Sequence, residues 1–233
     1  KVKERTSSGR IEKDWHPLNV TFCHLQFDEL LDSNTDLLGF ENGVYELETG
    51  VFRDSRPDDY RTMSVGYNYE EPLKEDMDTL LGVLKQLFPV EELYEYVMMF
   101  IASNLSGRVN EELIHFFTGS SSKQTGGNGK STLKNLINIT MGDYSCQDHP
   151  SIITSSREKA ESTNTAILSL KGKRHVSFQE IQDSEINMAV IKGMTGNDTV
   201  EARGLYSREQ TKFKPHWHLS ISANTIPPMS AYD

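Results

Sequence analysis

One glycine-rich segment constrains the fold of this chain more than any other feature of its sequence. Residues 126–132 read Gly-Gly-Asn-Gly-Lys-Ser-Thr and lie between an apolar stretch, 113–117, and an amphipathic stretch, 133–141. Glycines let the backbone turn tightly enough to aim several N–H groups at a polyphosphate, and the following helix adds the positive end of its dipole. The sequence therefore predicts a strand, a phosphate-binding loop and a helix in this order.

The residues of this loop have expected roles in binding ATP. Lys130 would reach the β- and γ-phosphates, and the Ser131 hydroxyl would bind Mg²⁺. The cofactor-binding residues are Gly126, Gly127, Asn128, Gly129, Lys130, Ser131 and Thr132. The loop is longer than usual, because Gln124 stands where a glycine is expected and Gly119 is the glycine that could open it. The alternative interpretation is a surface linker, which the flanking strand and helix disfavour.

Composition limits the partners that this chain can have. Its 233 residues suffice for one large domain, or for one domain with a smaller appendage. A net charge of −10 argues against a broad basic DNA-binding face, although a few basic residues could converge on one restricted surface. The longest apolar run, 97–102, is too short to span a bilayer, so we expect no membrane partner and an intracellular location.

The two ends and the cysteines add smaller constraints. The chain starts at Lys1, and residues 230–233 show no helix stop or closing strand, so we interpret it as part of a longer polypeptide. Cys23 and Cys146 form no Cys-x-x-Cys pair, which is typical of packed thiols in a reducing compartment.

Hydrophobic periodicity divides the chain into four segments. Residues 1–27 are a linker or arm, and 28–73 form a small mixed α/β segment with a short helix and tightly turned strands. Residues 74–110 form a helical hairpin broken at 88–89, whose apolar stripes we expect to be core. In residues 111–233 strands alternate with helices, which indicates a parallel sheet. The strands are expected near 113–118, 174–179 and 217–223, and the helices near 130–141, 156–170 and 184–194.

Hydrolysis of a nucleotide also needs an acid and a polar sensor at the γ-phosphate. Glu180 follows an apolar strand, 175–179, that we expect to lie beside the phosphate loop, so it would bind Mg²⁺ and activate water. Asp183 is a weaker candidate, and an ordinary strand-end carboxylate is the alternative. Asn224 follows the last strand and could hold both the γ-phosphate and the attacking water, although Asn before Thr and Pro is also a turn signal.

The order of these motifs resembles that of superfamily 3 helicases. The similarity is closest to the helicase part of the primase–helicases of large nucleocytoplasmic DNA viruses and of related phages and plasmids. The matching residues are Glu180 and segments 30–53, 128–131, 171–174, 191–203 and 221–227. The resemblance covers about residues 28–233. This chain departs from the family at Gln124 and at Asn197, where a second glycine is common.

The resemblance implies an AAA+-like P-loop ATPase domain that forms a ring, as a hexamer, and moves 3′ to 5′ along single-stranded DNA. A hairpin at 200–214 would project into the channel, where phosphate contact and base stacking suit its side chains. The DNA-binding candidates are Arg203, Tyr206, Arg208 and Lys212. The alternative is a solvated hairpin whose charges keep it soluble. His216 and His218 could form a metal pair, but a half-buried strand fits them better.

The family also implies parts that lie outside this sequence. An arginine from the neighbouring subunit follows the sensor asparagine in the family, so this chain alone is expected to hydrolyse ATP weakly. Replication proteins, such as a polymerase or a processivity factor, are expected partners, in the host cytoplasm or at a viral replication site. Two other functions stay open. One is a P-loop kinase, and the other is a nucleotide-dependent assembly scaffold that does not hydrolyse ATP.

Overall fold

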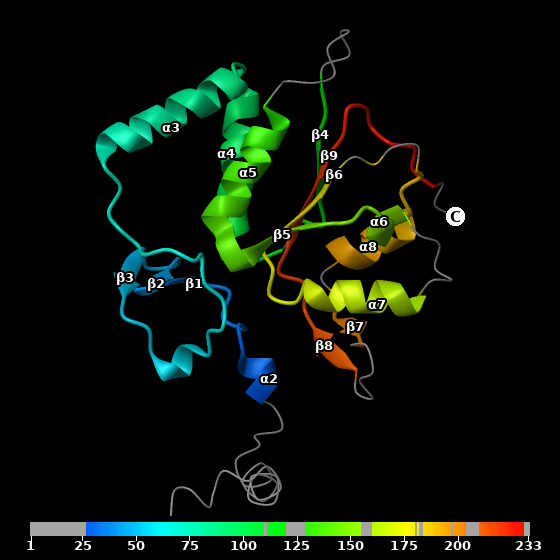
Figure 1. Cartoon of the computed structure of the whole chain (residues 1–233), viewed down its shortest axis with the longest axis horizontal. Coiled ribbons are helices and arrows are strands. Elements are labelled where there is room, and N and C mark those ends of the chain that lie inside the picture. Colours follow the sequence, from blue (N-terminus) through cyan, green and yellow to red (C-terminus); the bar gives the residue numbers. More distant parts are fainter. Residues whose placement is uncertain are drawn as a thin grey trace, which may run out of the picture.

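The structure is a computed structural model that describes residues 27–109, 111–119, 129–154, 160–179, 181, 184–196, 198–203 and 210–230. Figure 1 shows helices packed on both faces of a central sheet, with a small sheet and a hairpin beside it. The helices are α2 (Phe27–Leu30), α3 (Lys74–Leu87), α4 (Glu91–Ser106), α5 (Lys130–Met141), α6 (Ser151–Thr154), α7 (Ala160–Ser169) and α8 (Met188–Thr195). The strands are β1 (Leu37–Phe40), β2 (Gly43–Glu46), β3 (Val51–Arg53), β4 (Ile114–Phe117), β5 (Ser145–Asp148), β6 (His175–Gln179), β7 (Val200–Ala202), β8 (Thr211–Phe213) and β9 (His218–Ser222).

The central sheet confirms the expected α/β class. Its four strands pair in parallel in the order β4–β9–β6–β5. The strands predicted near 113–118, 174–179 and 217–223 are β4, β6 and β9, whereas the short polar strand β5 is not predicted from the sequence. The strand that precedes Glu180 is not the direct neighbour of β4, because β9 pairs with both β4 and β6.

The two faces of this sheet are covered by different helices (Figure 1). Helices α6, α7 and α8 cover one face, where the strand residues Val176, Phe178, Leu219 and Ile221 are fully buried. Helices α4 and α5 cover the other face, and their buried residues include Val97, Phe100, Leu133 and Ile137. The molecule is therefore a three-layer α/β/α arrangement around one parallel sheet.

Residues 27–73 build the small antiparallel sheet β1–β2–β3. The strands expected around the Asn-Gly and Thr-Gly steps are present. Phe40 packs edge-on to Tyr69, with ring centroids 5.3 Å apart, and Phe52 stacks on Tyr69 at 4.6 Å. These rings cover one side of a sheet that would otherwise be marginal in water.

Arg174 joins this small sheet to the central one. Its guanidinium donates to the carbonyl of Leu37 at 2.6 Å and to the carbonyl of Leu105 at the end of α4. The same group lies 4.4 Å from the ring centroid of Tyr144, and the Tyr144 hydroxyl accepts a hydrogen bond from the Gly39 amide. Burial lowers the pKa of Arg174, and the carbonyl contacts compensate the buried charge.

The helical hairpin forms where its period predicts, but its packing differs from the prediction. Helices α3 and α4 are separated at 88–90, as the Phe-Pro break requires. In α3 only Leu84 is buried, while Leu80 is 43% exposed, so the expectation that its apolar stripe is core is wrong. Helix α4 packs better, because Val97 and Phe100 face the central sheet.

Helices α7 and α8 differ from their predicted bounds. Helix α8 begins later than predicted, because the side chain of Asn187 caps it by accepting from the amides of Ala189 and Val190. Helix α7 occupies much of the predicted 156–170 segment. In the described part of the chain, no helix is long and apolar enough to cross a membrane.

Candidate functional site

The carboxyl edge of the central sheet brings several predicted site residues together. Phe117 of β4 and Gln179 of β6 are both level with Ser222 of β9, so these strands end at the same height. Ala223 donates its amide to the carbonyl of Phe117 at 3.2 Å, and the exposed Asn224 follows. Asn224 therefore follows β9 at a position between the end of β6 and the end of β4, the strand that precedes the predicted phosphate-binding loop. Ligands of parallel sheets bind at this edge.

Helix α5 begins at the same edge with the predicted lysine. Lys130 is its first residue, and Gly129 precedes it with φ of 79°, a left-handed conformation that favours glycine. A Cβ on Gly129 would also lie 2.3 Å from Cδ2 of Leu87 in α3. Glycine cannot supply a side-chain cap, so the first-turn amides of α5 need another acceptor. An anion such as a phosphate group meets this need.

The structure describes only part of the predicted loop and site. Ser131 and Thr132 lie in the first turn of α5 with exposed side chains. The predictions for Gly126, Gly127, Asn128, Glu180, Tyr206 and Arg208 lie outside the described residues. Gly119 lies two residues after β4, where the longer loop is expected to open. In the described ranges, no group of three His, Cys, Asp or Glu side chains could hold a metal ion, so His216 and His218 form no such cluster there.

A polar chain that sequence reasoning misses connects α5 to the ends of β5 and β6. Lys134, which is 8% exposed, donates from Nζ to Oε1 of Gln147 at 2.6 Å. Gln147 donates in turn from Nε2 to Oε1 of Gln179 at 3.2 Å. Gln179 directly precedes Glu180. The only signal in the sequence is that Lys134 lies one helical turn after Lys130.

The predicted hairpin is present as β7 and β8. Glu201 pairs with Lys212 in register, and Lys212 Nζ lies 2.5 Å from Glu201 Oε1 at an exposed position. Phe213 packs edge-on to Trp217 at 6.0 Å, which anchors the base of the hairpin on the core. Arg203 directly follows β7 and is exposed. The described residues therefore present Arg203 and Lys212 to solvent.

Cys146 of β5 is a free thiol at a half-buried position. Burial raises its pKa to about 11, and Asp148 adds to this effect. The thiol is therefore protonated at neutral pH and is a poor nucleophile. This agrees with the prediction of a packed thiol.

Comparison with known proteins shows what this chain is similar to. Residues 10–89 match the family described as "D5 N terminal like". The chain is 37% identical over 207 residues to a "Putative helicase" of Acanthamoeba polyphaga mimivirus, covering 87% of this chain and 21% of that protein. It is 30% identical over 199 residues to a "Putative primase" of African swine fever virus, covering 82% of this chain and 20% of that protein.

These relatives confirm the resemblance to helicase and primase proteins of large DNA viruses. The chain spans about a fifth of the length of these curated relatives. A solved structure of the NrS-1 C terminal region aligns with a TM-score of 0.43 and 15% identity, covering 66% of this chain and 34% of that one. A likeness that distant does not assign a fold.

Proposed function

We propose that this chain is the ATP-dependent DNA helicase module of a viral-type replicative primase–helicase. It is an AAA+-like P-loop ATPase of superfamily 3, and it couples ATP hydrolysis to translocation on single-stranded DNA and to duplex unwinding. The geometry of the carboxyl edge carries this proposal. Helix α5 starts there at Lys130, and β9 leads into Asn224 between β4 and β6. The relatives named as helicase and primase support the same role.

In this proposal the first turn of α5 binds the phosphates of ATP. The amides after Gly129 and the ammonium of Lys130 hold the β- and γ-phosphates, and the longer loop from Gly119 wraps them. Ser131 and Glu180 would hold Mg²⁺, which would neutralise negative charge on the phosphates. The N-cap of α5, Gly129, provides no side-chain acceptor, which suits an anion at the first-turn amides.

The remaining residues act on water and on the transferred phosphoryl group. Glu180 accepts the proton of the attacking water, and the amide of Asn224 orients this water against the γ-phosphate. The chain Lys134–Gln147–Gln179 links α5 to the end of β6, the strand that directly precedes Glu180 in the sequence. An arginine from a neighbouring subunit completes the site in a ring, which we propose to be a hexamer.

The hairpin is the proposed DNA contact. Arg203, Arg208 and Lys212 would pair with phosphates, and Tyr206 would stack on a base or pack against a sugar. The exposed pair of Lys212 with Glu201 is worth about 0–1 kcal/mol, so a phosphate can replace the carboxylate. A polymerase or processivity factor is a proposed partner of the whole protein.

ATPase activity tests this function. In the full-length protein, the change Lys130→Ala should lower ATP turnover, with and without single-stranded DNA, by at least about a hundredfold. The matched control is Lys74→Ala, which removes an exposed ammonium at the start of α3, the opposite end of the helix from the Leu87 that approaches Gly129, and should leave turnover unchanged. Unchanged rates in Lys130→Ala would contradict the proposal. Ring formation with ATP but no turnover would favour an assembly scaffold, and phosphoryl transfer to a non-water acceptor would favour a kinase.

A further inference from the structure

Two glutamines near the carboxyl edge of the central sheet have amide orientations that one lysine fixes. Lys134 Nζ lies 2.6 Å from Oε1 of Gln147, and an ammonium group can only donate hydrogen bonds. The opposite orientation of the Gln147 amide would place its NH₂ group against the ammonium, donor against donor. Gln147 must therefore turn its oxygen toward Lys134.

This orientation passes on to Gln179. With its oxygen on Lys134, Gln147 turns its Nε2 group toward β6 and donates to Oε1 of Gln179 at 3.2 Å. Gln179 uses its oxygen in this contact, so its own Nε2 group is the end of the amide that does not face Gln147. Within the described part of the chain, this Nε2 group donates to no acceptor. Gln179 therefore keeps N–H donors for an oxygen of a ligand.

These donors lie at the edge of the sheet where the nucleotide site is proposed. Gln179 is the half-buried last residue of β6, level with Ser222 of β9, which precedes Asn224 by two residues. At the other end of the chain of hydrogen bonds, Lys134 lies one helical turn after Lys130 in α5. The chain thus connects the helix that would hold the phosphates to the strand ends that would face the γ-phosphate.

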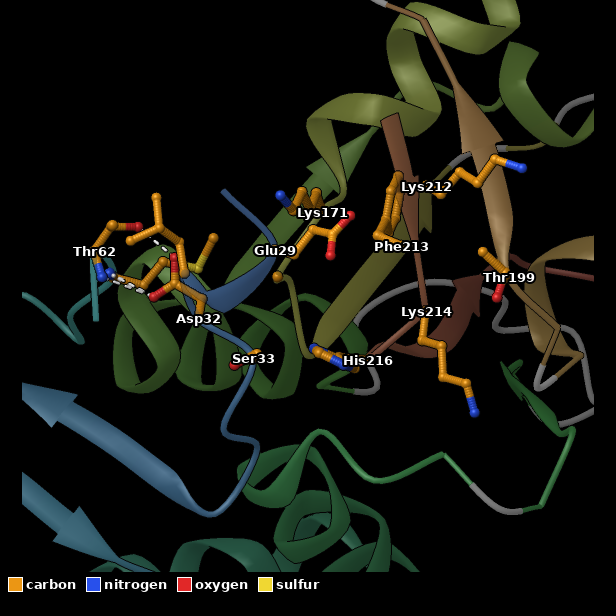
Figure 2. A pocket seen from close by; sticks show the side chains of 13 residues that line it. Glu29, Asp32, Ser33, Thr62, Lys171, Thr199, Lys212, Phe213, Lys214 and His216 are labelled. Carbon is orange, nitrogen blue, oxygen red and sulfur yellow. Dashed lines mark hydrogen bonds between the residues drawn. The ribbon is translucent and has the colours of Figure 1, made fainter. Parts of the chain in front are cut away.

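The amino edge of the sheet shows no comparable excess of donors. A cavity of about 510 Å³ lies near this edge, where His216 precedes β9 (Figure 2). The ammonium of Lys212 pairs with Glu201, and the carboxylates of Asp32 and Glu29 line the same space. Charges of both signs in one cavity favour no charged ligand. The glutamine chain differs, because all of its hydrogen bonds run in one direction and end on a donor.

The direction of the chain decides what Gln179 can bind. An amide NH₂ group offers no lone pair to a metal ion, and Mg²⁺ requires oxygen ligands. The orientation therefore suits an anion and not the metal. Phosphate oxygens are strong acceptors for N–H donors. Among the groups of ATP, the γ-phosphate is the one proposed to lie between the ends of β6 and β9.

We propose that Gln179 donates from Nε2 to an oxygen of the γ-phosphate, and that Lys134 and Gln147 are positioning residues that set its orientation. A carboxylate at position 147 would pair more strongly with the ammonium, but it would have no proton to donate to Gln179. The identity of the phosphate rests on the proposed ATPase function. The orientation of Gln179 does not, because it follows from Lys134.

The change Gln147→Glu tests this orientation with almost no change in shape. The carboxylate still accepts from Lys134 but cannot donate, so Gln179 must turn its NH₂ group toward position 147 and its oxygen toward the phosphate. We expect the affinity of the full-length protein for adenylyl imidodiphosphate with Mg²⁺ to fall about tenfold or more. The affinity for ADP should stay within about twofold of the unmodified protein. Isothermal titration calorimetry measures both.

The matched control is Asn34→Asp, the same change of an amide to a carboxylate at an exposed position before β1. The Asn34 side chain accepts from the amide of Asp36, and a carboxylate can keep this contact. The control adds the same charge as Gln147→Glu, so it should leave both affinities unchanged. Equal losses in the control and in Gln147→Glu would overturn the proposal.

A second variant separates orientation from charge. The change Gln179→Met removes the donors and should weaken binding of the triphosphate analogue about as much as Gln147→Glu does. Adding Gln147→Glu to Gln179→Met should then cause no further loss, because the change at 147 acts through Gln179. A further loss would contradict the proposal, since the new charge would then repel the nucleotide directly.

Other outcomes would also overturn the proposal. A chain of hydrogen bonds that only holds α5 to the sheet would leave the affinity of Gln147→Glu unchanged, because both of its contacts remain. Equal losses of the triphosphate analogue and ADP would remove the γ-phosphate from the contact. Thermal melts show whether each variant is folded, and Gln179→Met alone decides the phosphate contact if Gln147→Glu does not fold.

Failure of this proposal can be told from failure of the proposed function. If the unmodified protein binds the triphosphate analogue and Lys130→Ala abolishes this binding, the nucleotide site stands, and unchanged affinity in Gln179→Met sinks only the role of Gln179. If the unmodified protein binds no triphosphate, both proposals fail.

Discussion

The two faces of the central sheet are equally buried but chemically opposite. On one face Ile221 and Leu219 of β9 are fully buried in an apolar core. On the other face His175 is 1% exposed and Ser220 is 4% exposed, and both are polar. Because side chains alternate along a strand, successive residues of one strand lie on opposite faces of the sheet. The comparison shows that burial alone does not define the role of a residue in this sheet.

The polar face depends on hydrogen bonds that the apolar face does not need. His175 contacts the hydroxyl of Ser145 through Nδ1 at 3.0 Å and that of Ser220 through Nε2 at 2.9 Å. Within the described residues, three other buried atoms of this region find no hydrogen-bond partner: Asn104 Oδ1, His115 Nδ1 and His218 Nε2. An unsatisfied buried polar atom costs about 1–3 kcal/mol. Both faces therefore gain stability from apolar packing, but the unsatisfied atoms of the polar face offset part of that gain.

The largest expected effect comes from the apolar face. The change Ile221→Ala should lower the free energy of unfolding by about 2–5 kcal/mol, because it removes a fully buried side chain and leaves a cavity. Its matched control is the adjacent Ser220→Ala on the polar face, which should cost about 1–3 kcal/mol by leaving His175 Nε2 without its partner. Urea unfolding of both variants measures the difference. A greater loss in Ser220→Ala would reverse the comparison between the faces.

A smaller effect concerns acid pH and the polar face. Burial and, to a smaller extent, the nearby His218 and His115 together lower the pKa of His175 from 6.5 to about 4. The pKa values of His115 and His218 are lowered too, mainly by burial. Below pH 6.5 these histidines bind protons in the unfolded chain before they do so in the folded chain. The free energy of unfolding therefore falls as the pH falls. For His175 the loss reaches on the order of 3 kcal/mol as pH approaches 4.

Urea unfolding between pH 7 and pH 4 measures this dependence. Replacing His175 by Asn should flatten the part of the profile between pH 6.5 and 4, because an amide does not titrate in this range. The change His149→Gln, at an exposed histidine, is the matched control and should leave the slope in place. A slope that is the same in all three proteins would exclude His175 as its source.

The sequence predicts more of the fold than of the site. Strong periodicity and the Gly-Lys-Ser segment predict α5 and the strands β4, β6 and β9, because these elements follow local rules. Strand β5 is not predicted, because Ser145–Asp148 lacks alternating apolar residues. It forms by pairing with the edge of β6. The apolar stripe of α3 predicts a buried helix face. The helical period of this stripe does not show how much of the face other elements cover, and most of it is exposed.

Long-range contacts account for the rest of the candidate site. The position of β9 between β4 and β6 decides which residues meet at the carboxyl edge, and sequence spacing does not encode it. The link from Lys134 through Gln147 to Gln179 joins residues from three elements, so no local motif reveals it.

The most direct test of the central claim is a crystal structure of the full-length protein with a non-hydrolysable ATP analogue and Mg²⁺. We predict that the β- and γ-phosphates lie at the first turn of α5, with Lys130 Nζ on the phosphates. We also predict that the Asn224 amide and the Glu180 carboxylate lie within hydrogen-bonding distance of the γ-phosphate or its attacking water. A nucleotide bound away from α5, or a γ-phosphate that neither Asn224 nor Glu180 approaches, would contradict it.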